Sequence, residues 1–332
     1  MSVSGNQFID KNNSQILKGV GILLMLVHHL FYSESSRVMY DDIMLHGHGL
    51  VNEIGIFSKL CVAIFVFVSG YGLVCRYGDF SSWKPYYVSR FKKLYLNYWF
   101  IWLIFVPIGV FVFNRTFQDV YGTHVAMKAC LDFLGLLHLT GQFGYNPTWW
   151  FYSCIIVLYL IFPWLNSRFE KYPFFVLTLG IFAAFIGFIP FVQPYSRYLL
   201  PFMAGMFMAK NPSMFDGIGV VETLISLCML CFMRNFSGNL VFIVDTLICV
   251  GLAMLLHSTK HPKWLDSIMA NLGKHSMNIF MFHTFIFLYW FNDLIYVTRN
   301  PILIFISLLI PCYIISVIIE FIKNRIGFYQ LT

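Results

Sequence analysis

The sequence predicts an all-α, polytopic integral membrane protein, a bundle of about ten transmembrane helices with both termini cytoplasmic. Two observations lead to this fold class. Of the 332 residues, 59% are apolar and only 11% are charged, whereas soluble proteins carry roughly 25% charged residues. Apolar runs also follow one another with short connections along the whole chain. We therefore expect a single membrane-embedded domain over residues 1–332, without a separate soluble domain.

Ten apolar runs have about the length that a transmembrane helix needs, roughly 20 residues. They cover about residues 16–33, 55–75, 94–113, 148–166, 174–191, 195–210, 217–233, 240–257, 275–296 and 301–322. A further apolar piece, residues 126–139, is too short to span and contains Asp132 and His138. We expect this piece to lie at the membrane interface or to re-enter the membrane.

The distribution of cations orients the predicted spans. With the N-terminus inside, fifteen of the 22 lysines and arginines fall on the inner side, as the positive-inside rule requires. Both termini are then cytoplasmic, and the protein lies in the cell membrane. Residues 1–13 lack the basic start and small-residue cleavage site of a signal peptide, so the first helix should be retained. The net charge of +7 comes from cations in the connections, which does not favour a nucleic-acid partner.

The first span carries a cation and a histidine eleven residues apart, Lys18 and His29. Eleven residues are just over three helical turns, so both side chains lie within roughly 20° of one face and roughly 16 Å apart along the axis. Lys18 then lies at the inner edge, and His29 lies deep in the hydrocarbon. A titratable residue at that depth usually faces the bundle interior or a wet cavity. The alternative is a structural histidine that neighbouring helices satisfy.

Two motifs with polar or aromatic side chains lie in the second and fourth spans. Residues 69–72, Ser-Gly-Tyr-Gly, end the second span, where the glycines allow close helix packing and Ser69 and Tyr71 can face a cavity. The fourth span opens with tryptophans, including Trp150, which are also typical of the aromatic belt at the membrane boundary.

A basic pair and a second histidine follow. Arg90 and Lys93 lie one helical turn apart before the third span and can clamp phosphates from the cytosolic side. The alternative is a membrane anchor of the positive-inside type. His283, about two turns beyond His275 in the ninth span, is a second intramembrane histidine with either a structural or a catalytic role.

Redox and metal sites are not favoured. The eight cysteines lie in or beside apolar runs, and the CxxC of Cys228 and Cys231 lies on an apolar helix without a nearby histidine. His46 and His48, with Asp41 and Asp42 on the same outer loop, resemble a set of metal ligands, but the loop is short, and we expect no metal.

These motifs, in this order, resemble acyltransferase family 3 of the membrane O-acyltransferases over nearly the whole chain. The resemblance is carried by Lys-x10-His in the first span, Phe-Val-Ser-Gly-Tyr ending the second, RxxK before the third, Trp-Phe...Tyr-Leu-Ile-Phe-Pro in the fourth, Leu-Leu-Pro-Phe-Met-Ala-Gly in the sixth and LGKxS...H in the ninth.

The resemblance implies transfer of an acyl group, usually acetyl, from cytosolic acyl-CoA to a hydroxyl of a cell-surface glycan or its precursor. By position, His29 is the catalytic histidine, and Lys18, Arg90 and Lys93 contact the donor, acetyl-CoA. The family more often has arginine where Lys18 and Lys93 stand. Lysine keeps the charge but lacks the planar fork of arginine.

Physical chemistry is consistent with these implied roles. A neutral His29 can take the proton of the acceptor hydroxyl as its oxygen attacks the thioester, and an acyl-histidine intermediate is an alternative. Substrate contacts are expected from Ser69, Tyr71, Trp150 and His283, with Asn97 as a further candidate oxyanion donor.

Partners of other kinds follow from the same interpretation. Membrane lipid surrounds the bundle. The chain stops soon after Lys323 and Arg325, so a periplasmic partner domain, if acylation needs one, would come from separate envelope biosynthesis proteins. A transporter or flippase of a glycan intermediate is the rival function. An acyltransferase that acts on a lipid or small molecule differs only in its acceptor.

Overall fold

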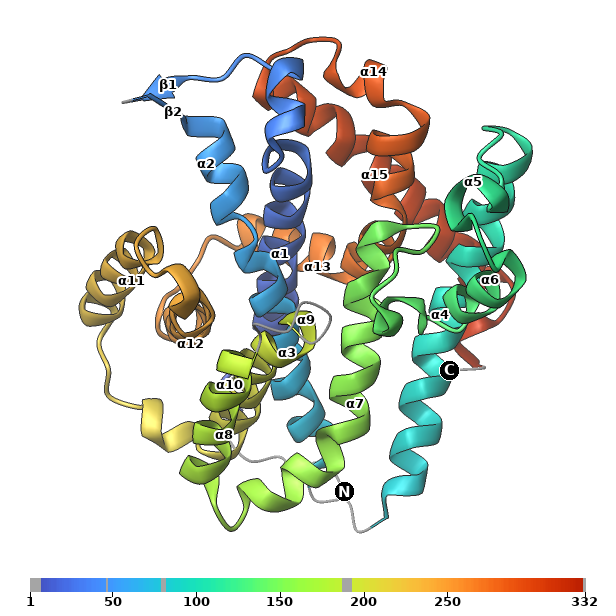
Figure 1. Cartoon of the computed structure of the whole chain (residues 1–332). Coiled ribbons are helices and arrows are strands. Elements are labelled where there is room, and N and C mark those ends of the chain that lie inside the picture. Colours follow the sequence, from blue (N-terminus) through green and yellow to red (C-terminus); the bar gives the residue numbers. More distant parts are fainter. Residues whose placement is uncertain (1–6, 46, 79–81, 187–192, 331–332) are drawn as a thin grey trace. The chain divides into compact units, whose positions relative to one another are not determined.

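The computed structural model describes residues 7–45, 47–78, 82–186 and 193–330, and these residues are mostly helical (Figure 1). The chain forms two compact units, each gathered from three separate segments. Unit 1 contains Met1–Gly21, Leu60–Tyr86 and Cys154–Lys274, and unit 2 contains Ile22–Lys59, Tyr87–Ser153 and His275–Thr332. The long helices α1, α4, α7 and α13 contribute residues to both units. This division does not test the single-domain prediction, which stays a prediction.

Unit 1 is built from helices alone among its described residues. Its elements are the first half of α1 (Lys11–Phe31), α3 (Leu60–Tyr77), most of α7 (Trp150–Phe169), α8 (Pro173–Phe185), α9 (Gln193–Arg197), α10 (Leu199–Lys210), η5 (Pro212–Phe215), α11 (Val220–Arg234), η6 (Gly238–Leu240), α12 (Val241–Ser258) and the first half of α13 (Lys263–Thr284).

One close helix crossing in unit 1 joins α3 and α10 through two glycines. A Cβ atom on Gly70 would overlap the carbonyl oxygen of Phe202, and a Cβ on Gly205 would overlap the carbonyl oxygen of Phe67. Small residues let two helix backbones approach this closely. The glycine of the Ser-Gly-Tyr-Gly motif at Gly70 therefore serves packing.

A buried ion pair connects the next two helices of unit 1. Figure 1 shows α11 and α12 side by side, and the Arg234 guanidinium on α11 pairs with both carboxylate oxygens of Asp245 on α12. Both side chains are about one tenth exposed or less. Each charge compensates the other, as a buried charge requires.

Unit 2 adds a small hairpin to a larger set of helices. Its elements are the end of α1, η1 (Glu34–Met39), β1 (Met44–Leu45), β2 (His48–Gly49), α2 (Leu50–Phe57), most of α4 (Trp83–Phe111), α5 (Phe117–Tyr121), α6 (Val125–Phe133), η2 (Leu137–Thr140), η3 (Pro147–Trp149), the end of α13, η7 (Phe285–Trp290), α14 (Asn292–Tyr296), α15 (Pro301–Arg325) and η8 (Phe328–Gln330). The two strands pair antiparallel, Met44 opposite Gly49 and Leu45 opposite His48.

The core of unit 2 is aromatic. Phe105 of α4 stacks on Phe282 of α13 with ring centroids 5.0 Å apart. The Trp149 ring meets the Tyr98 ring at 4.9 Å and the Phe285 ring at 6.0 Å. Offset and edge-to-face ring pairs of this kind stabilise a core beyond the area they bury. They hold α4, η3 and the end of α13 together.

Among the residues that the structure describes, six helical segments are long and apolar enough to cross a membrane: Lys11–Phe31, Leu50–Tyr77, Trp83–Phe111, Pro147–Phe169, Gly238–Ser258 and Pro301–Arg325. They match six of the ten predicted spans. The other four spans also contain helices, but α8, α10 and α11 have only 13, 12 and 15 residues, and α13 begins in a polar stretch at Lys263. Residues 187–191 of the fifth predicted span lie outside the described residues. The number of ten crossings therefore stays a prediction.

Several boundaries differ from the predicted ones. α4 begins at Trp83 rather than near residue 94, because the basic stretch before the apolar run continues the helix. The ninth span was placed at 275–296, but α13 begins at Lys263 and ends at Thr284, where a π-helical turn, η7, follows. The apolar piece 126–139 forms only the short α6 and η2 and is no spanning helix.

Candidate active site

The centre of the candidate site is a group of histidines in unit 2. The His29 ring at the end of α1 lies with its centroid 5.0 Å from the His283 ring of α13 and 5.1 Å from the His28 ring. His283 is fully buried, whereas His29 is partly exposed. Of the predicted site residues, the structure thus brings His29 and His283 together. Of the two residues, only His29 keeps solvent-accessible surface.

Hydrogen bonds determine the tautomer of His283. Its Nδ1 lies 3.1 Å from the carbonyl oxygen of Ile279 and 3.0 Å from that of Phe280. A carbonyl oxygen only accepts, so Nδ1 carries the proton and Nε2 keeps its lone pair in the neutral ring. The Thr284 hydroxyl lies 3.3 Å from that Nε2. His283 therefore has a fixed ring orientation beside His29.

His28, whose ring also lies next to that of His29, is held in the same way. Its Nδ1 lies 2.8 Å from the Gly55 carbonyl oxygen of α2, to which it donates. Gly55 has to be glycine, because a Cβ there would overlap the backbone at Phe31 and Tyr32. The close approach of α2 to the end of α1 thus positions His28 and, next to it, His29.

The end of α13 is anchored by residues just before and within the fourth span. The fully buried Trp149 donates from its indole to the Met281 carbonyl oxygen at 3.0 Å, and the Asn146 amide donates to the same oxygen at 3.2 Å. The hydroxyls of Thr148 and Thr284 lie 3.2 Å apart. These bonds support the second residue before His283, Met281, and the residue after it, Thr284. π-helical turns such as η7, which follows directly, often occur at functional sites.

Trp150, the tryptophan that the sequence selected, follows Trp149 directly in the chain. It lies at the start of α7, partly exposed, with its ring 6.0 Å from the Phe151 ring. The sequence drew attention to Trp150 as a polar aromatic at a membrane boundary, but the fully buried Trp149 makes the hydrogen bond to α13.

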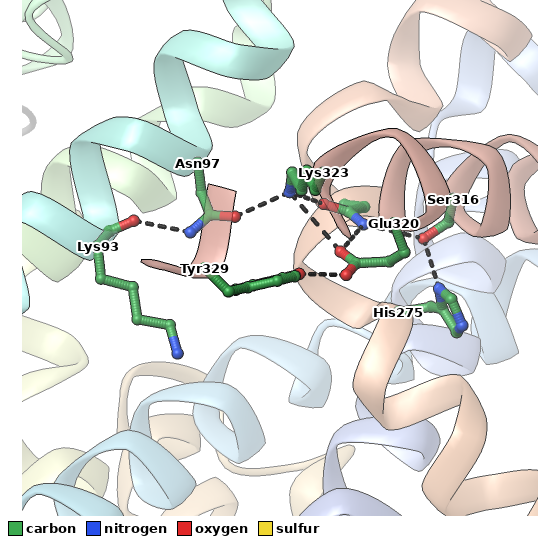
Figure 2. A network of polar contacts seen from close by, with 8 residues as sticks. Lys93, Asn97, His275, Ser316, Glu320, Lys323 and Tyr329 are labelled. Carbon is green, nitrogen blue, oxygen red and sulfur yellow. Dashed lines mark hydrogen bonds and ion pairs between the residues drawn. The ribbon is translucent and has the colours of Figure 1, made fainter. Parts of the chain in front are cut away.

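The basic pair Arg90 and Lys93 lies on α4, also in unit 2, one turn apart. Arg90 is partly exposed and Lys93 is exposed. The carbonyl oxygen of Lys93 accepts a hydrogen bond of 2.7 Å from the Asn97 amide, and this amide belongs to a larger polar network (Figure 2). The network contains the buried Lys323, which sequence reasoning did not select.

The three other predicted site residues lie in unit 1. Lys18 is partly exposed on α1, three turns before His29 on the same continuous helix. Ser69 is partly exposed on α3, whereas Tyr71 is buried, and its hydroxyl accepts a 2.7 Å hydrogen bond from the backbone of Ile9. The Tyr71 hydroxyl thus anchors the segment before α1.

The acidic residues of the predicted outer loop have structural partners. Asp41 pairs with Arg299 at 2.9 Å, and the Asp42 carboxylate accepts from the backbone of Val51 and Asn52 at the start of α2. His46 lies outside the described residues. Within the described part of the chain, no group of three or more His, Cys, Asp or Glu side chains is arranged to hold a metal ion.

Two buried titratable side chains, Asp132 and His138, lie in α6 and η2. Asp132 is 1% exposed, and one of its carboxylate oxygens accepts from the Tyr121 hydroxyl at 2.6 Å and from the Tyr145 backbone at 2.7 Å. Burial raises the pKa of Asp132 to about 6 despite these bonds. Burial likewise lowers the pKa of His138 to about 4.

Sequence signals for the missed residues are weak. Trp149 was visible as part of an aromatic belt, Thr148 as the residue before it, and Lys323 as a cation near a helix end. Their roles depend on which helices meet, and no local spacing gives that information.

Comparison with known proteins gives one match. The model of the acyltransferase domain that defines acyltransferase family 3 matches residues 9–321 of the chain. No curated protein and no solved structure matches.

Proposed function

Because the chain belongs to acyltransferase family 3, and is thus a membrane-embedded acyltransferase, we propose that it moves an acetyl group from cytosolic acetyl-CoA to a hydroxyl of a cell-surface polysaccharide or its precursor. The protein lies in the cytoplasmic membrane with both termini inside. The observation that carries the proposal is the pair of His29, partly exposed, and His283, buried and fixed in orientation.

The proposed reaction transfers one proton and one acyl group. His29 takes the proton of the acceptor hydroxyl while the hydroxyl oxygen bonds to the thioester carbonyl carbon. The carbon–sulfur bond then breaks, and the proton passes from His29 to the departing thiolate, so that an ester and free CoA result. A positioned general base of this kind contributes roughly 10²–10⁴ in rate. His283, with Nδ1 on its own helix, keeps the neighbouring ring in place.

The donor is proposed to enter from the cytosolic side. Its phosphates contact Arg90 and Lys93, which lie one turn apart on α4 with Lys93 exposed to an incoming anion. Lys18 is proposed as a further contact, and Ser69, Tyr71 and Trp150 remain candidates for the acceptor or the oxyanion. Guanidinium and ammonium groups bind phosphate through charge-assisted hydrogen bonds.

The test is acetyl transfer in sealed inverted vesicles that contain envelope acceptors and receive labelled acetyl-CoA on the cytosolic face. We expect the wild type to transfer label, and His29→Ala at equal expression to lower the rate by roughly 10²–10⁴. His283→Asn keeps a donor near the two carbonyls but loses Nε2, and should lower the rate less than His29→Ala.

The matched control is His124→Asn, because His124 is exposed and has positive φ, which asparagine adopts readily. It should transfer label at the wild-type rate. No transfer by the wild type despite competent acceptors would favour the transporter. Equal transfer by wild type and His29→Ala would keep the enzyme class and remove His29 from the mechanism.

A further inference from the structure

We propose that Lys323 and the polar side chains around it are positioning residues for the donor. They hold the turn of α4 that carries Arg90 and Lys93, and so determine how tightly the phosphate-bearing end of acyl-CoA binds. This inference rests on the proposed function and adds residues that the histidine and cation motifs do not contain. All of its members lie in unit 2.

Lys323 is buried at the meeting point of three elements. Its side chain is fully buried, and its Nζ donates to the amide oxygens of Asn97 on α4 and Asn278 on α13, each at 2.8 Å. Glu320, one turn earlier on α15, lies 3.7 Å away as an ion-pair partner. The Phe100 and Phe328 rings lie 5.3 and 5.2 Å from Nζ. Figure 2 shows these polar contacts converging on the lysine.

Lys323 determines the orientation of the Asn97 amide. An ammonium group only donates, so the Asn97 oxygen has to face Lys323 and the amide nitrogen has to face away. That nitrogen donates to the Lys93 carbonyl oxygen at 2.7 Å, one turn back along α4. Figure 2 shows the Lys93 side chain extending away from Asn97. The buried lysine therefore fixes, through one amide, the backbone from which the exposed lysine projects.

The other side of the network connects α15 to α13. Three residues on one face of α15, Ser316, Glu320 and Lys323, each contact Asn278. Ser316 also bonds to His275 at 2.9 Å, and the Tyr329 hydroxyl bonds to Glu320. The network is thus anchored on two helices, which gives it the rigidity to hold the α4 turn.

Stability alone is a weak reason for this arrangement. A buried ion pair in such a place contributes little net stability, and apolar replacements of similar volume are often neutral or stabilising. Residues of this kind in membrane helices are costly and commonly functional. The network ends at the Lys93 carbonyl oxygen, and Lys93 is one of the two cations proposed to meet phosphate, so the donor is the ligand that benefits.

The experiment compares two donors, acetyl-CoA and S-acetylpantetheine, which has the same thioester and arm but no phosphate. In Lys323→Met we expect KM for acetyl-CoA to rise by roughly tenfold, with kcat nearly unchanged. For S-acetylpantetheine, kcat/KM should stay within about twofold of the wild type. Lys210→Met is the matched control, because Lys210 in unit 1 also pairs with a glutamate, at 3.4 Å, and its loss changes the net charge equally. It should leave both donors unaffected.

A second variant keeps the test decisive if Lys323→Met does not accumulate. Asn97→Asp retains an acceptor for Lys323 but places a carboxylate oxygen against the Lys93 carbonyl. It should therefore weaken the binding of acetyl-CoA but not that of S-acetylpantetheine. Equal loss with both donors, a fall in kcat alone, or unchanged kinetics would overturn the positioning role while the wild-type enzyme still transfers acetyl groups. Failure of the wild type with both donors would instead overturn the proposed function, and the positioning role with it.

Discussion

In His28 and His283, a hydrogen bond to the backbone fixes the tautomer and orientation of an imidazole in apolar surroundings. Each ring directs Nδ1 at a backbone carbonyl, so each is a fixed tautomer with its basic nitrogen at Nε2. The His29 ring centroid lies 5.1 Å from that of His28 and 5.0 Å from that of His283. Two rings with assigned protons thus lie next to the ring that the proposed chemistry requires to change its protonation.

Asp132 and His138 should make opposite contributions to the pH dependence of stability. The pKa of Asp132 is raised to about 6, so between about pH 4 and 6 the folded chain keeps a proton that the unfolded chain loses, and stability falls as pH rises. The pKa of His138 is lowered to about 4, so between about pH 4 and 6.5 the unfolded chain holds the extra proton, and stability rises with pH. The two effects largely cancel in the wild type.

Single substitutions should reveal each contribution. Relative to the wild type, Asp132→Asn should gain stability as pH rises from 4 to 6, and His138→Gln should lose stability from 4 to 6.5. Each slope is at most about 1.4 kcal/mol per pH unit. Chemical unfolding in detergent at several pH values measures the differences. Two flat difference curves would show that neither group titrates as its burial implies.

The α3–α10 crossing, at the scale of helices, depends on backbone contact. Gly70→Ala should force the helices apart, because the new methyl group would overlap the Phe202 carbonyl oxygen. We expect a loss of roughly 1–3 kcal/mol, seen as a lower Tm of the detergent-solubilised protein. Gly72→Ala is the matched control, two residues along the same helix, with nothing within 4 Å of its Cβ position. Equal Tm values for the two variants would contradict the crossing.

Helix existence could be read from the sequence more reliably than helix limits. The apolar runs located a helix in all ten predicted spans, since burial in lipid demands apolar side chains. The polar starts of α4 and α13 were missed, because residues such as Lys84 and Asp266 continue a helix beyond the apolar stretch. Likewise, the spacing of Lys18 and His29 predicted that both lie on one face of α1. It could not predict that the His283 ring lies next to His29.

The orientation of the whole molecule in the membrane can be tested by cysteine labelling. The cation distribution predicts that residues 114–147 lie outside, and Cys130 in that segment is exposed. A membrane-impermeant maleimide should label Cys130 on intact cells. In a Cys130→Ser background, Lys92→Cys, at an exposed inner position, should be labelled only after the membrane is opened. The reverse pattern would invert the topology and the proposed side of donor entry.

Long-range polar contacts were beyond the reach of the sequence. Lys323 lies 226 residues from its partner Asn97 and 45 residues from its partner Asn278. No local sequence pattern connects them. The sequence did indicate the basic pair Arg90 and Lys93, because two cations one turn apart form a local pattern. The polar network around Lys323 that supports this pair forms only where α4, α13 and α15 meet.

The π-helical turn after Thr284 determines where an insertion or deletion in this part of the chain can be tolerated. In η7 the Phe291 amide bonds to the Ile286 carbonyl oxygen, five residues back, so the turn accommodates one residue more than an α-helical turn. A one-residue deletion there restores ordinary α geometry and leaves Asn278 and His283 in their mutual register. An insertion between Asn278 and His283 would rotate the imidazole by roughly 100° away from His29. Length changes are therefore absorbed downstream of the histidine and excluded upstream of it.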